Sequence, residues 1–119
     1  MKAIEYTLLK EIPIPADITG LLVPGEEAVM AFKTLRDSAT FTTKRLVVRD
    51  VQGVGKKVEL YSLPYHSIEM WSSENLDIID IDKRMRLWTP HAGEVTLKLG
   101  RGADIRRIDS LIAQAVLNR

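Results

Sequence analysis

The 119-residue sequence contains no cysteine. This absence excludes disulfide bonds, thiolate-bound metals and thiol nucleophiles, and it is compatible with a reducing compartment. The sequence also lacks a large net charge of either sign, because 17 Lys and Arg residues oppose 16 Asp and Glu residues. A formal charge of +1 provides no global field that would recruit nucleic acid or an anionic membrane. We therefore predict no nucleic-acid binding, and membrane contact would require a local basic patch.

Long apolar runs are absent as well. No stretch approaches the roughly 18–20 consecutive apolar residues of a membrane-spanning helix. Residues 1–11 contain neither an apolar run of signal-peptide length nor a small-residue cleavage site, so we expect a cytoplasmic protein. The length and a hydrophobic fraction of 45% indicate one globular domain over residues 1–119.

The hydrophobic periodicity predicts a mainly β fold over residues 27–100. Apolar residues alternate with period two in six segments, 27–33, 38–49, 57–63, 68–72, 83–88 and 94–99. Strands joined by such short connections pair in an antiparallel meander. Because sheets twist, we expect this meander to bend toward a partly open barrel.

The two ends of the chain have different patterns. Pro13, Pro15 and Pro24 divide an N-terminal extension, residues 1–26, in which residues 16–22 are predicted to form a short helix. Residues 1–11 are ambiguous, because their apolar residues fit a helical stripe equally well. After Asp104, a candidate N-cap, apolar residues recur at helical spacing and predict a helix over 103–118 that closes the barrel. Its outer side would leave Arg106, Arg107 and Asp109 free for neighbouring subunits.

Four short motifs occur in order through the middle of the chain. They are RD at 36–37, FTTKRL at 41–46, DVQGVGKK at 50–57 and LPYHSI at 63–68. This run resembles the bacterial pleckstrin-homology (PH) domain family, which shows RD, FT-x-KRL, D-x-QG-x-x-GKK and PY-x-SI at comparable spacing. The resemblance implies a PH-like, strongly bent, partly open antiparallel β-barrel capped by a C-terminal α-helix. It also implies a tendency to form ring-shaped homo-oligomers, and it implies no defined reaction.

The sequence departs from the family pattern between residues 74 and 82. Where the family usually has a Glu-Thr-Ala-Gly-like stretch, this chain has Asn75, Leu76 and Asp77 after Glu74. A family ligand contact in this loop is therefore not carried over to this chain.

A set of basic residues near the glycine turn at 53–55 is a candidate anion site. Its members are Lys44, Arg45, Arg49, Lys56 and Lys57. Exposed amides of a glycine turn beside lysines can hold a phosphate, including one at a membrane surface. The alternative is a solvated hairpin whose lysines oppose edge-to-edge aggregation. The alternative is favoured, because Lys56 and Lys57 would point to opposite faces of a strand and no helix pattern follows them.

An acidic stretch extends from Ser67 to Asp82 without any Lys or Arg. Asp80 and Asp82 would share one face of a strand, which is a partial site for a hard cation. No calcium-loop glycine and no complete ligand set accompany them, so no metal is predicted. Pairing of this acidic surface with the basic surface of another copy would instead provide the head-to-tail contact of a cyclic homo-oligomer.

Trp71 and Trp88 are candidate interface residues. Tryptophan buries a large area while keeping one hydrogen-bond donor, and it is enriched in protein interfaces. Each follows an apolar residue, Met70 or Leu87, so in a regular strand each would face away from that neighbour. Packing in the core is the alternative.

Residues with catalytic spacing are lacking. His66 and His91 have no partners at metal-ligand or acid–base spacing, no serine lies in a nucleophile-elbow context, and Arg36-Asp37 is expected to be a local ion pair. No enzyme activity and no cofactor are predicted. The leading hypothesis is a non-catalytic binding or scaffold module that self-assembles and can take a further protein partner. The alternative is binding of an anionic lipid or small anion at the membrane surface through the basic hairpin.

Overall fold

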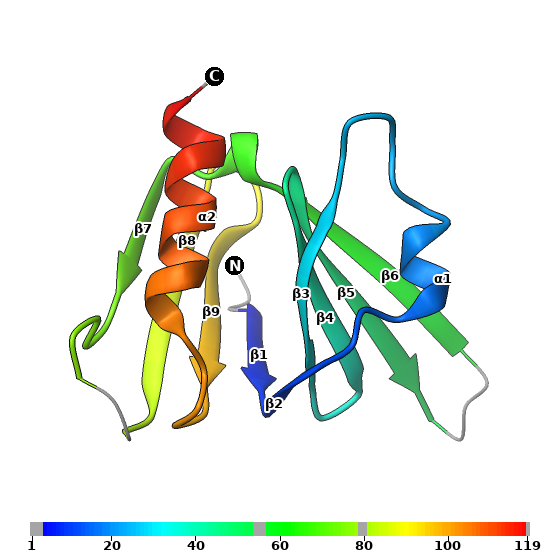
Figure 1. Ribbon diagram of the computed structural model, residues 1–119, viewed down its shortest axis with the longest axis horizontal. Helices are drawn as coiled ribbons and strands as arrows, with labels where there is room; N and C mark the ends of the chain where they lie inside the picture. The colour runs from blue at the N-terminus through cyan, green and yellow to red at the C-terminus, as the bar shows by residue number, and fades with distance from the viewer. Residues whose placement is uncertain (1–3, 54–56, 79–80, 119) are drawn as a thin grey trace.

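The computed structural model of the chain describes residues 4–53, 57–78 and 81–118, and these form two β-sheets (Figure 1). Sheet A contains β1 (Ile4–Leu8), β9 (Gly93–Leu99), β8 (Lys83–Thr89) and β7 (Met70–Ser73), in this spatial order. Sheet B contains β2 (Lys10–Ile12), β3 (Ala28–Lys33), β4 (Asp37–Thr42), β5 (Arg45–Gln52) and β6 (Lys57–Pro64). The sheets do not close into a barrel, and the mainly β, PH-like fold with a C-terminal helix is confirmed.

The expected strand over residues 38–49 is wrong in one respect, because it is two strands joined by a tight turn. The Thr42 hydroxyl accepts hydrogen bonds from the backbone amides of Lys44 and Arg45, both at 3.0 Å. This side-chain acceptor stabilises the reversal between β4 and β5, as threonine commonly does in turns. Period two continues through both strands, so the alternation alone does not reveal the turn.

The N-terminal residues are strands and complete both sheets. β1 pairs in parallel with β9, which places Ile4 opposite Val95 and Leu8 opposite Leu99. β2 pairs antiparallel with β3. The fold is therefore not a simple meander, because its first strand lies beside its last. The predicted short helix is α1 (Ala16–Thr19), which lies on the outside of sheet B (Figure 1). Its Ile18 is fully buried.

The core lies between the inner faces of the two sheets. Phe32 and Phe41 of sheet B pack edge to face with ring centroids 6.0 Å apart. From sheet A, alternate residues of β8 and β9 such as Leu87 and Leu97 face the same core and are fully buried. The short 3-10 helix η1 (Tyr65–Ser67) contributes the buried ring of Tyr65.

The C-terminal helix α2 (Ile105–Leu117) covers one side of this core. Its Ile105, Ile108 and Ile112 are buried, and each contributes roughly 1.5–3 kcal/mol of apolar burial. The predicted N-cap is confirmed, since the Asp104 carboxylate accepts a hydrogen bond from the Arg107 amide at 3.2 Å. No helix among the described residues is long and apolar enough to cross a membrane.

Contrary to the prediction, side chains on the outer side of α2 are not free. Asp109 accepts hydrogen bonds from Trp71 Nε1 at 3.0 Å and from Ser73 Oγ at 2.7 Å, and so joins α2 to β7. Arg106 forms an ion pair with Asp77. Arg107 reaches Glu11 of β2 at 3.5 Å. The helix therefore bridges the two sheets on the side of β7 and β2, whereas β1 and β6 face each other across the opposite side.

The expected local ion pair between Arg36 and Asp37 is also wrong. Arg36 Nε lies 2.8 Å from Asp50 Oδ1, and Arg49 donates to Asp37 Oδ2 at 2.7 Å. Asp37 and Asp50 are directly opposite each other on β4 and β5, so these arginines pair across strands. Adjacent residues at a strand end point in different directions, which explains why sequence neighbours do not pair.

Candidate functional site

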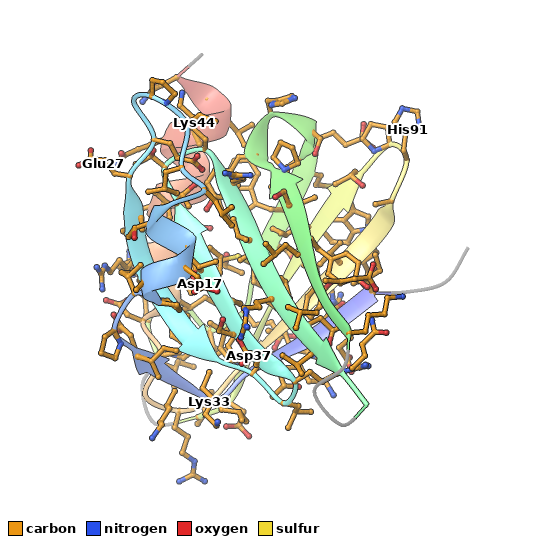
Figure 2. All side chains as sticks on the ribbon, turned by 90° about the vertical axis from the view of Figure 1, so that its right-hand side faces the viewer. Asp17, Glu27, Lys33, Asp37, Lys44 and His91 are labelled. Carbon is orange, nitrogen blue, oxygen red and sulfur yellow. The ribbon has the colours of Figure 1, made fainter. Side chains whose placement is uncertain are left out.

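The basic residues of the predicted anion site do not converge. β5 pairs with β6 so that Arg45 lies opposite Pro64 and Gln52 lies opposite Lys57. Lys44 and Arg45 are therefore at one end of β5 and Lys57 is at the other, roughly 24 Å away at ~3.4 Å per residue. In Figure 2, Lys44 lies at the top of the molecule, and Asp37, the partner of Arg49, lies in its lower half. Lys56 lies outside the described residues.

Most of these basic residues already have acidic partners. Arg49 is paired with Asp37 and lies 3.3 Å from Asp17 of α1. Lys57 lies 3.6 Å from Glu59. Among the described basic residues of the set, Lys44 is the one without an ion pair in the described part of the chain. The paired side chains hold the strands together and leave little free positive charge.

Arg45 lies at the centre of a network that the motif residues build. The Glu26 carboxylate accepts three hydrogen bonds. The donors are Arg45 Nε at 2.9 Å, the Thr42 hydroxyl at 2.6 Å and the Val23 amide at 3.0 Å. Burial raises the pKa of Glu26, but the hydrogen bonds from Arg45, Thr42 and Val23 outweigh it and lower the pKa to about 2. The carboxylate is therefore charged and fully satisfied.

Tyr65 extends this network into the core. Its hydroxyl donates to the Thr42 carbonyl at 2.9 Å, and its amide donates to the Lys44 carbonyl at 3.0 Å. Burial is the main reason that the pKa of Tyr65 is raised. The FTTKRL and LPYHSI motifs thus meet in space and fix the β4–β5 turn, which is a structural role.

The two tryptophans occupy different environments. Trp71 lies opposite Leu87, packs against the core and donates to Asp109 of α2. The Trp71 side chain therefore faces the core, which agrees with core packing, the alternative to an interface role. Trp88 lies opposite Met70 and is half-buried on the outer face of sheet A, because its neighbour Leu87 faces inward. Trp88 therefore remains a surface candidate, whereas Trp71 is part of the helix contact.

The acidic stretch does not form a site in the described residues. Asp80 lies outside them. Asp82 is exposed and lines a surface cavity of about 550 Å³ at the end of sheet A, where Lys83, Arg84 and Glu74 also lie. Residues 4–53, 57–78 and 81–118 contain no group of three or more side chains placed to hold a metal ion. His66 lies in η1 and His91 in the turn between β8 and β9, so they come from separate connections.

An opening between β1 and β6 was not anticipated from the sequence. A cavity of about 170 Å³ lies there, lined mainly by apolar side chains of β1, β5, β6 and β9. A second cavity of about 200 Å³ adjoins it, and Tyr6 and Val48 line both. The second cavity has a mixed lining, with Asp50, Arg36 and Thr34 as polar members of its wall. Arg36 and Asp50 in this wall belong to two of the motifs, but the rest of the lining comes from segments far apart in the sequence, so no single motif marks the cavity.

These residues and their two-sheet arrangement define a PH-like domain. The model of the bacterial PH domain family matches residues 2–116, and the chain belongs to this family. Two relatives from Bacillus subtilis (strain 168) are similar. The uncharacterized protein YjqA is 38% identical over 81 residues, which are 67% of this chain and 65% of YjqA. The uncharacterized protein YozO is 26% identical over 97 residues, 82% of this chain and 84% of YozO.

Solved structures agree with this assignment. A DUF1696 family protein with a pleckstrin-homology domain from Shewanella loihica PV-4 has a TM-score of 0.75 at 30% identity, over 88% of this chain and 94% of that one. A pleckstrin homology domain from Shewanella amazonensis SB2B has a TM-score of 0.62 at 36% identity, over 85% and 84%. The chain is therefore similar to bacterial PH domains in both sequence and fold.

Proposed function

We propose that this chain is a non-catalytic binding and scaffold module that self-assembles head to tail into a closed homo-oligomer. The observation that carries the proposal is a pair of exposed apolar edges. Val58 and Leu60 of β6 are 48% and 46% exposed, and Met70 of β7 is 52% exposed beside Trp88. β6 and β7 lie at opposite sides of the molecule (Figure 1).

Both edges have reasons to be covered by another chain. β6 and β7 are the end strands of their sheets, so the backbone groups on one side of each strand have no strand partner among the described residues. An exposed apolar edge strand favours pairing with another chain. Because the two edges differ and lie on opposite sides, a contact between them is heterologous, and repeated heterologous contacts close into a ring when their rotation permits.

Apolar contact supports this assembly better than pairing of the two charged surfaces. Arg45, Arg49 and Lys57 already form ion pairs within the chain. They would have to exchange these partners to bind an acidic surface. We therefore expect the oligomer to persist at 0.5 M salt, where exposed ion pairs are strongly screened.

Light scattering coupled to size-exclusion chromatography tests the proposal. The wild-type chain should elute as one oligomer, and Leu60→Asp or Met70→Asp should each shift the mass toward the monomer. Leu117→Asp is the matched control, because Leu117 is 70% exposed at the end of α2 and belongs to neither edge. A wild-type monomer at about 100 µM would contradict the proposal.

The alternative, binding of anionic lipid or a small anion through the basic hairpin, has weaker support. It needs several free cations on one surface. The set is spread along β5, and Lys44 alone among its described members is without an ion pair in the described residues. Sedimentation with anionic vesicles distinguishes the two functions.

A further inference from the structure

The apolar cavity between β1 and β6 has the size and lining of a small-ligand site. Its volume is about 170 Å³, and Ile4, Leu46, Leu63 and Val95 contribute to its wall. A dry, apolar cavity of roughly 150 Å³ is large enough to bind benzene. This apolar cavity, called the chamber below, can therefore hold one aromatic ring or a short branched alkyl group.

A buried carboxylate, that of Asp50, lines the adjoining cavity of about 200 Å³. Asp50 is on β5 in line with Leu46 and Val48, so it faces inward, and it is 9% exposed. Gln52 Nε2 donates to its Oδ2 at 3.2 Å. Its Oδ1 lies 2.8 Å from Arg36 Nε but accepts no hydrogen bond from the described residues. A carboxylate has about four acceptor positions, so Asp50 retains capacity for a donor from a ligand.

Two tyrosines stand at the same opening and experience a negative field. Burial raises the pKa of Tyr6, and the nearby Tyr61 and Asp50 raise it further. Desolvation also raises the pKa of Tyr61, with Glu59 and Asp50 adding to the effect and Lys57 opposing it. Phenol rings attract cations through their faces. The rings and the carboxylates therefore favour a positively charged group.

We propose that this opening binds a small molecule that combines a primary ammonium group with a compact apolar body. The ammonium group donates to Asp50 between Tyr6 and Tyr61, and the apolar body enters the chamber beside Leu63 and Val95. Arg36 is 58% exposed at its side chain and can turn toward solvent while Asp50 accepts the ligand. The site uses side chains on the inner face of β6, whereas the proposed assembly uses Val58 and Leu60 on its outer face, so the two proposals rest on different side chains.

Three probes of nearly equal size test the charge preference. Benzylamine, benzyl alcohol and benzoate are titrated into the 15N-labelled chain while amide shifts are followed by NMR. Benzylamine should cause saturable shifts at Tyr6, Val48 and Tyr61, with an affinity at least about tenfold higher than benzyl alcohol. Benzoate should cause none. Equal or tighter binding of benzoate, or no saturable shift with any probe, overturns the proposal.

Two variants separate the head group from the body. Asp50→Asn should weaken benzylamine about tenfold and leave benzyl alcohol unchanged, whereas the exposed control Asp77→Asn changes neither. Because Asp50 also contacts Arg36, a second variant leaves the carboxylate in place. Ala92→Leu fills the chamber from the β8–β9 turn and should weaken both probes. Undiminished benzylamine binding by folded Asp50→Asn, or by folded Ala92→Leu, would refute the assignment.

Discussion

Replacing Glu26 by Gln tests the network that joins the N-terminal segment to the β4–β5 turn. The substitution keeps the shape of the side chain but removes the charge that Arg45, Thr42 and Val23 hydrogen-bond. It leaves the Arg45 guanidinium, whose side chain is 23% exposed, without its carboxylate partner. We expect the free energy of unfolding to fall, because a half-buried cation is costly when unpaired.

The magnitude follows from the pKa of Glu26, which is about 2 in the folded chain against an ordinary value of 4.5. This difference corresponds to ~3 kcal/mol, and solvent screening around the partly exposed pair reduces it to ~1–2 kcal/mol. Because the folded pKa is lowered, the stabilisation is fully present above pH 4.5 and is lost as the pH falls toward 2. The difference between wild type and Glu26→Gln should therefore shrink in acid.

Urea unfolding between pH 7 and pH 2.5 measures both effects. Glu27→Gln is the matched control, since Glu27 is the exposed neighbour and its side chain has no ion pair among the described residues. It should unfold like the wild type. Equal midpoints for wild type and Glu26→Gln at pH 7, or a difference that stays constant down to pH 2.5, would refute the reasoning.

Three further outcomes follow from other contacts. Tyr65→Phe leaves the buried Thr42 carbonyl without its donor and should cost about 1–2 kcal/mol in urea unfolding, so unchanged stability would show the bond to be dispensable. Asp104→Ala removes the N-cap of α2 and should cost about 0.5–2 kcal/mol, with loss of helical circular dichroism on heating before the sheets unfold. In sedimentation with vesicles of anionic lipid at low salt, the chain should stay in the supernatant, and Lys44→Glu should not change this result. Salt-sensitive pelleting of the wild type that Lys44→Glu abolishes would favour the membrane function.

The period-two segments and the terminal helical stripe were sufficient to predict the class of fold. Alternation reports which side chains are buried, and residues such as Met85 and Leu87 show it clearly. Alternation does not reveal the β4–β5 turn, because it persists on both sides of the turn. The parallel pairing of β1 with β9 depends on residues about 90 positions apart, which a local pattern does not encode.

Side-chain partners were harder to predict than strands. Arg36 pairs with Asp50 rather than with its neighbour, because the register of β4 on β5 places them together. The helical spacing places Asp109 outside the apolar stripe of α2. Nevertheless, β7 lies close enough for Trp71 and Ser73 to donate hydrogen bonds to Asp109. Both outcomes depend on how elements dock, which the sequence pattern leaves open.

The motif residues illustrate a similar limit. In the sequence, Thr42, Arg45 and Tyr65 belong to the family signature, and Arg45 is also a candidate for anion binding. In the structure these residues hydrogen-bond to one another and to Glu26, and they stabilise the β4–β5 turn. A charged residue in a recognised motif can therefore serve the fold, and its internal partners decide how much charge remains for a ligand.

A mixing experiment tests the central claim, head-to-tail assembly through two different edges, most directly. Leu60→Asp retains an intact β7 edge and Met70→Asp retains an intact β6 edge, so each variant alone should be monomeric by light scattering. Mixed in equal amounts, they should form a dimer that contains one chain of each, because one good contact remains and the ring cannot close. A mixture that remains monomeric, while the wild type is oligomeric, would contradict the account.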